Sequence, residues 1–143
     1  MLTEESRAGT DFLAGLAQEW EAEALKAEAL GIRVVLARFG IILARHGGAL
    51  AKMLLPFKLG AGGRLGSGRQ WMSWVTLEDV VGILRLATEG APGKGAPNAD
   101  SVRGVMNVVA PQPVRNTEFT KVLAKALHRP ALFPAPVDRK SVV

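Results

Sequence analysis

The chain has 143 residues, 48% of them hydrophobic and 22% charged, which is typical of one globular domain and excludes a disordered polymer. It contains no Cys, no Tyr and two His, so disulfides, thiolate metal sites and a phenolic acid or base are excluded, and a histidine zinc centre is hard to assemble. The net charge of +5 is uneven, because residues 29–77 hold seven Arg or Lys and no carboxylate, while no apolar run approaches the roughly 20 residues that span a bilayer.

The first predicted element is a helix over Asp11–Leu30. Apolar residues recur there every three or four positions, so we expect one buried face. Gly31 follows as a C-cap. The apolar, β-branched run Arg33–Arg38 is then typical of a parallel strand covered on both faces.

A second helical pattern covers Gly47–Leu59 and is interrupted by Pro56. The next nine residues, Gly60–Gly68, include five glycines, which neither a helix nor a central strand tolerates. This segment is predicted to be a loop.

The rest of the chain alternates extended and helical patterns. Gln70–Val75 is aromatic and extended, and Thr76–Gly90 is predicted to be a helix capped by its threonine. Gly90–Asp100 is rich in Pro and Gly and predicts a loop, Gly104–Val109 predicts a strand, and Asn116–Leu127 predicts a helix. The alternation indicates an α/β protein.

The element order suggests a piece of a longer protein. A doubly wound domain usually begins with a strand and a glycine-rich turn, whereas here a helix comes first and only three strands are predicted. The tail Asp138–Val143 matches the translation of a common sequencing-library adapter, so we interpret residues 137–143 as a non-native scar and residues 1–136 as the family domain.

Three stretches together carry a family resemblance: Arg38–Leu50, Leu54–Trp74 with Thr76–Asp79 after it, and Met106–Phe119. They resemble the C-terminal half of extended short-chain dehydrogenase/reductases, and more narrowly the NAD-dependent epimerase/dehydratase family that ends in a small domain of unknown function. The resemblance implies an incomplete α/β fold: the C-terminal part of a Rossmann-like, doubly wound parallel sheet plus part of the substrate-side lobe. It also implies NAD or NADP as the cofactor of the full-length protein.

Two departures from the superfamily pattern concern its chemistry. The superfamily's Tyr-x-x-x-Lys pair passes a proton during hydride transfer, but Leu13 and Ala17 occupy those positions here. The arginine that binds the diphosphate of nucleotide sugars is replaced by Met72. No catalytic residue and no metal ligand can therefore be assigned.

Candidate binding residues lie in two places. The carboxyl end of the first strand faces the cofactor crevice in this architecture, so Phe39, Gly40 and Ile41 are predicted cofactor contacts. The glycine loop and the extended run after it supply the predicted substrate contacts, with Trp71 at the pocket rim and Trp74 in the core. The predicted substrate-binding residues are Arg64, Arg69, Gln70 and Trp71.

The leading functional hypothesis is the substrate-side half of an NAD(P)-dependent oxidoreductase or sugar-nucleotide epimerase-like protein, inactive and unable to bind NAD(P) as this chain alone. The alternative is a protein that binds or senses a dinucleotide without turnover, and a third interpretation is a basic nucleic-acid-binding module. The favoured partner is a small anionic substrate such as a nucleotide sugar, with no nucleic acid and no membrane, and the oligomeric state is not assigned. We expect a cytoplasmic protein, or an organellar one if a transit peptide precedes Met1.

Overall fold

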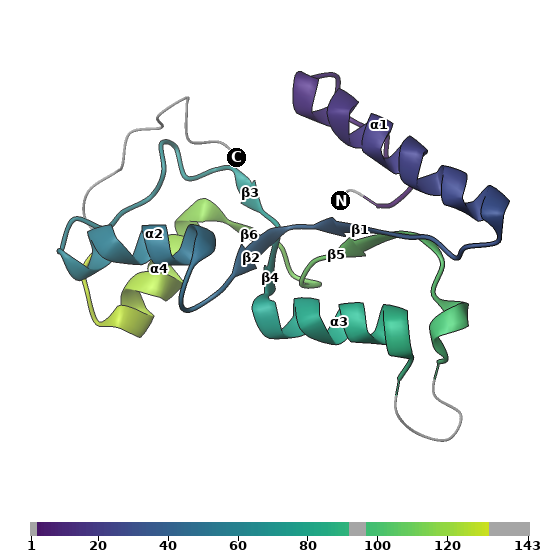
Figure 1. Cartoon of the computed structure of the whole chain (residues 1–143). Coiled ribbons are helices and arrows are strands. Elements are labelled where there is room, and N and C mark those ends of the chain that lie inside the picture. Colours follow the sequence, from purple (N-terminus) through teal and green to yellow (C-terminus); the bar gives the residue numbers. More distant parts are fainter. Residues whose placement is uncertain (1–2, 92–96, 132–143) are drawn as a thin grey trace. The chain divides into compact units, whose positions relative to one another are not determined.

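The computed structural model describes residues 3–91 and 97–131, which fall into two compact units (Figure 1). The first unit contains the chain up to Phe39 together with Glu78–Val108, and the second contains Gly40–Leu77 together with the chain from Val109 onward. Much of the predicted loop Gly90–Asp100 and the whole tail 137–143 lie outside the described residues. Across the described ranges, no helix has both the length and the apolarity needed to cross a bilayer.

In the first unit, the predicted N-terminal helix is confirmed as α1 (Phe12–Leu25), which continues as the 3₁₀ helix η1 (Lys26–Leu30). The Asp11 carboxylate caps α1 by accepting a hydrogen bond from the Ala14 N–H, and Gly31 ends η1 with φ of 75°. The expectation of a buried face is wrong: α1 has no buried residue, and Trp20 is 68% exposed.

The two predicted strands of this unit pair with each other. β1 (Val35–Phe39) runs parallel to β5 (Gly104–Val108), with Val35 opposite Gly104 and Phe39 opposite Val108. Figure 1 shows α1 and α3 (Leu77–Glu89) on opposite sides of this pair, and η2 (Ala99–Ser101) precedes β5. Val108 is fully buried, but β1 is only half-buried rather than covered on both faces, because β5 is its one paired neighbour among the described residues.

The second unit contains two further strand pairs and two helices. β2 (Ile41–Leu43) is parallel to β4 (Trp74–Thr76), and β3 (Trp71–Met72) is antiparallel to β6 (Val114–Arg115). Helices α2 (Gly48–Lys58) and α4 (Asn116–Leu127) confirm the two predicted helices and lie side by side (Figure 1). β2 and β6 were not predicted as strands.

The glycine-rich segment is the predicted loop, and part of it is packed into the second unit. Phe57 near the end of α2 is 5% exposed, and a Cβ on Gly62 would lie 2.4 Å from its ring. Only glycine leaves room for the backbone to pass the ring at this point. Val75 and Met72, at 1% and 4% exposed, are also buried core residues of this unit, while Trp74 is half-buried.

Candidate functional site

The glycine loop of the second unit is held against the first turn of α4. The Leu65 N–H donates to the Asn116 side-chain oxygen at 2.8 Å, and the Asn116 N–H donates to the Gln70 carbonyl at 3.0 Å. Thr117 donates to the Gly68 carbonyl twice, from its N–H at 3.0 Å and from its hydroxyl at 2.9 Å. These bonds link the second half of the loop and the residues that follow it, Leu65–Gln70, to the first turn of α4, so this part of the backbone is fixed.

All four predicted substrate residues lie on this loop or directly after it, and all four are exposed. The Gln70 side-chain amide donates to the Leu65 carbonyl at 3.0 Å, so one of its hydrogen-bond donors is used within the loop. Among the described residues, neither Arg64 nor Arg69 has a carboxylate within the 4.0 Å of an ion pair. The structure thus places two exposed cations on the glycine loop, and the exposed indole of Trp71 follows in β3.

Arg115, which the sequence analysis did not single out, belongs to the same group. It is opposite Trp71 in the β3–β6 pair, and its guanidinium carbon lies 4.2 Å from the centre of the Trp71 ring. Its Nη1 also donates to the Arg69 carbonyl. Because Arg115 and Trp71 are far apart in the sequence, only the strand register reveals this contact.

The three predicted cofactor residues lie where β1 ends and β2 begins. Phe39 ends β1 and is 44% exposed. Gly40 faces the backbone of Ser73, whose carbonyl oxygen would lie 2.7 Å from a Cβ placed on it, and the Ile41 N–H donates to the same oxygen at 2.8 Å. Close strand packing therefore accounts for this glycine, and the cofactor role of Phe39, Gly40 and Ile41 stays a prediction.

The described residues do not fit the diphosphate of a dinucleotide. Such a group is held where a strand passes through a Gly-x-Gly-x-x-Gly turn into a helix. The nearest arrangement is β2 leading to α2 through Gly47 and Gly48, which lacks that spacing, whereas the glycine loop leads into β3. No group of His, Asp or Glu suitable for a metal ion occurs within residues 3–91 and 97–131.

In the first unit, an ion pair joins α1 to β1. Both Glu21 carboxylate oxygens accept bonds from the Arg38 guanidinium, at 2.7 and 2.6 Å. This bidentate contact lowers the pKa of Glu21 and raises that of Arg38. Glu4 accepts the Asn107 N–H at 2.9 Å, which lowers the pKa of Glu4.

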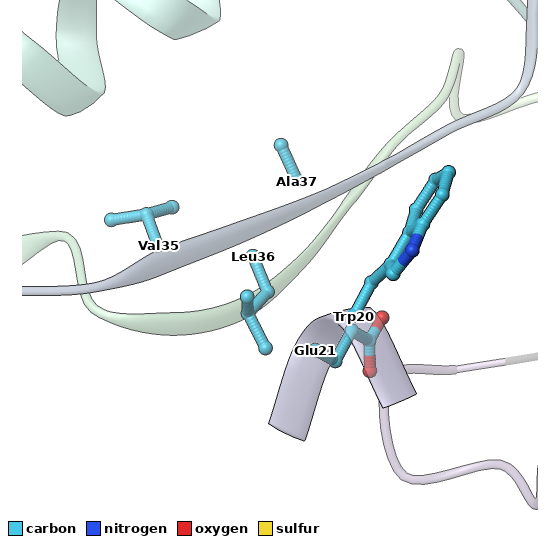
Figure 2. A pocket seen from close by; sticks show the side chains of 5 residues that line it. All are labelled: Trp20, Glu21, Val35, Leu36 and Ala37. Atoms are coloured by element: carbon cyan, nitrogen blue, oxygen red, sulfur yellow. The ribbon is translucent and has the colours of Figure 1, made fainter. Parts of the chain in front are cut away.

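Two shallow hollows lie along α1. One, of about 190 Å³, is bounded by α1 and β1; Figure 2 shows the Leu36 side chain on the α1 side of the strand, with Val35 and Ala37 turned the other way. The other, of about 260 Å³, includes Ala17, the position where the resemblance expects a lysine. Leu13 stands one turn earlier and is 59% exposed, so neither position offers a titratable group. The second hollow is lined by Thr3, Ser6, Arg7, Ala8, Ala14, Ala17, Gln18, Glu21, Arg38 and Asn107.

The sequence of the chain is similar to those of known epimerase family proteins. No family profile matches the chain. An epimerase family protein of Bacillus subtilis is 45% identical over 126 residues, which are 88% of this chain and 38% of the relative. One from Mycobacterium leprae is 41% identical over 136 residues, covering 95% of this chain and 41% of the relative. The chain thus spans about two fifths of the length of these curated relatives.

Solved structures agree with the sequence matches. A human epimerase family protein with NADPH has a TM-score of 0.75 and 39% identity, with 93% of this chain and 42% of that chain covered. A nucleoside-diphosphate sugar epimerase from Corynebacterium glutamicum has a TM-score of 0.71 and 37% identity, with 87% and 25% covered. A Thermotoga maritima UDP-glucose 4-epimerase, at 19% identity and a TM-score of 0.63, shares the fold alone; 91% of this chain and 41% of that chain are covered. The chain is therefore homologous to epimerase family proteins of the NAD-dependent epimerase/dehydratase type, as its motifs suggested, and its α/β fold is part of their Rossmann-type fold.

Proposed function

We propose that this chain is the substrate-side part of an NAD(P)-dependent epimerase-like or oxidoreductase protein that acts on a small anionic substrate such as a nucleotide sugar. The observation that carries the proposal is the 39% identity and 0.75 TM-score shared with an epimerase family protein whose structure contains NADPH. The nucleoside-diphosphate sugar epimerase at 37% identity supports the substrate class. On this proposal, the remainder of the family protein holds the cofactor, and this chain alone neither binds NAD(P) nor turns over substrate.

The structure supports the exposed loop arginines as the anion contacts. Met72, which stands at the superfamily's phosphate-binding arginine position, is 4% exposed, and its sulfur accepts a bond from the Asn116 side-chain amide at 3.3 Å. A buried thioether in this position belongs to the core and cannot contact a phosphate. Arg64 and Arg69 on the neighbouring loop therefore replace the lost charge, and Gln70 and Trp71 form the rim of the site.

A second function is favoured by α1. Leu13 and Ala17 leave the helix without a proton-transfer group at the two positions where the superfamily carries Tyr and Lys. A family protein with this helix would bind a dinucleotide without oxidising an alcohol by the usual route. NADPH titration of the full-length protein, followed by a turnover screen with nucleotide sugars, separates the two: binding with turnover supports the enzyme, and binding alone supports the sensor.

The substrate assignment is tested separately by Arg69→Ala in the full-length protein. Loss of a charge-assisted hydrogen bond should weaken binding of the nucleotide sugar by about 1–3 kcal/mol and leave NADPH binding unchanged. An unchanged substrate affinity in a folded variant would remove Arg69 from the site.

A further inference from the structure

We propose that Arg115, held over the Trp71 ring, is an anion-binding residue that forms a phosphate site together with Arg69. This inference rests on the proposed function, since it adds a residue to the same substrate site. Arg115 reaches the site from the β6–α4 junction, whereas Arg69 and Trp71 come from the glycine loop and β3. Two segments that are distant in the sequence thus converge on one patch.

The charge of the second unit favours an anionic ligand. Its described residues include nine Arg or Lys side chains and one carboxylate, that of Glu118. None of these cations forms an ion pair with a carboxylate within the described residues. A surface with this balance attracts anions before any specific contact forms. The nine basic residues are Arg45, Lys52, Lys58, Arg64, Arg69, Arg115, Lys121, Lys125 and Arg129.

The positive end of α4 is not itself the site. Its first two N–H groups, on Asn116 and Thr117, already donate to the Gln70 and Gly68 carbonyls. These N–H groups of the helix terminus therefore hold the loop. An anion at this surface would be bound by Arg and Lys side chains instead. Fixing the loop in this way also fixes the Arg69 carbonyl that orients Arg115.

The guanidinium of Arg115 is oriented while most of its donors remain available. Of its five N–H donors, one bond goes to the Arg69 carbonyl, and the described residues supply no other acceptor. The contact with the Trp71 ring and the bond to the Arg69 carbonyl restrain the guanidinium group, so less conformational freedom is lost when it binds a planar or tetrahedral oxyanion. Trp71 is itself 62% exposed, which leaves the patch open to solvent.

The test is calorimetric titration of the complete chain with inorganic pyrophosphate at pH 7.5, compared among wild type, Arg115→Gln, Arg115→Lys and Arg129→Gln. Arg115→Gln should raise the Kd about tenfold or more, because it removes the charge and the paired donors. Arg115→Lys should recover part of the affinity, since it keeps the charge but not the planar fork. Arg129→Gln, an equal loss of charge just beyond the far end of α4, should bind like wild type.

Circular dichroism and thermal unfolding of each variant show whether it is folded, and Arg69→Gln serves as a second variant of the site if Arg115→Gln is unfolded. A Kd for Arg115→Gln equal to that of wild type overturns the inference, and Arg69→Gln is judged in the same way when it replaces that variant. The inference also fails if the wild-type chain does not bind pyrophosphate. An equal effect in Arg129→Gln also overturns it, because it shows attraction by net charge alone. If the site binds pyrophosphate as described but the full-length protein neither binds NADPH nor accepts a nucleotide sugar, the site stands and the proposed function fails.

Discussion

Gly68 is the position where a single added methyl group should disrupt the hydrogen bonds between the glycine loop and the first turn of α4. Its φ is 69°, and a Cβ placed on it would lie 2.1 Å from the Thr117 hydroxyl oxygen. The left-handed backbone costs a non-glycine residue about 1–2 kcal/mol. Turning the Thr117 hydroxyl away to relieve the overlap costs its 2.9 Å bond to the Gly68 carbonyl, about 1 kcal/mol more. We therefore expect Gly68→Ala to reduce the free energy of unfolding by about 2–3 kcal/mol.

A double-mutant cycle with Thr117→Ala separates these two contributions. In the Thr117→Ala background the hydroxyl is absent, so Gly68→Ala should cost only the backbone strain, about 1–2 kcal/mol. Gly47→Ala is the matched control, because nothing lies within 4 Å of its added Cβ and its φ of 174° is extended. Urea unfolding gives the four free energies. An equal cost of Gly68→Ala in both backgrounds would refute the overlap with Thr117, and a cost as small as that of Gly47→Ala would refute the whole argument.

Two further predictions concern close backbone packing and the acid stability of the first unit. Gly40→Ala should destabilise the chain by about 1–3 kcal/mol in urea unfolding, because its Cβ would lie 2.7 Å from the Ser73 carbonyl; a cost no larger than that of Gly47→Ala would contradict this. Glu21→Gln should cost about 0.5–1 kcal/mol at pH 7, a solvent-screened value for a pair whose Glu21 side chain is 25% exposed. Since Arg38 lowers the pKa of Glu21 from its usual 4.5, that contribution is fully present above about pH 4.5 and lost as the pH falls through the native pKa, so the variant should lose less stability on acidification. Parallel pH profiles for wild type and Glu21→Gln would show that the pair contributes nothing.

The sequence predicted the elements whose patterns are local and long. The helices from Asp11, Gly47, Thr76 and Asn116 each repeat apolar positions over several turns, and the structure contains all four. β2 and β6, with three and two residues, are too short to show a period, so only their pairing defines them.

Burial was predicted less well than element type, for a physical reason. An apolar stripe shows which face of α1 prefers contact, but contact requires another element, and the described residues leave Trp20 68% exposed. The same holds for β1, which has one paired neighbour in the part of the chain that the structure describes. Arg115 was not predicted, because its proposed role depends on Trp71. That residue lies 44 positions earlier in the sequence and is opposite Arg115 only in the β3–β6 register.

The basic residues in the middle of the sequence fall into two groups in the structure: those with a carboxylate nearby and those without one among the described residues. Of its seven Arg and Lys residues, Arg33 and Arg38 belong to the first unit, where Asp100 lies 3.9 Å and Glu21 lies 2.6 Å from them. Their charges are offset within that unit. The other five belong to the second unit, whose described residues contain one carboxylate, and one of them, Arg69, accepts through its backbone carbonyl a hydrogen bond from Arg115, which lies over the Trp71 ring. Because the described residues of this unit do not offset that charge, its surface favours the small anionic substrate that we propose.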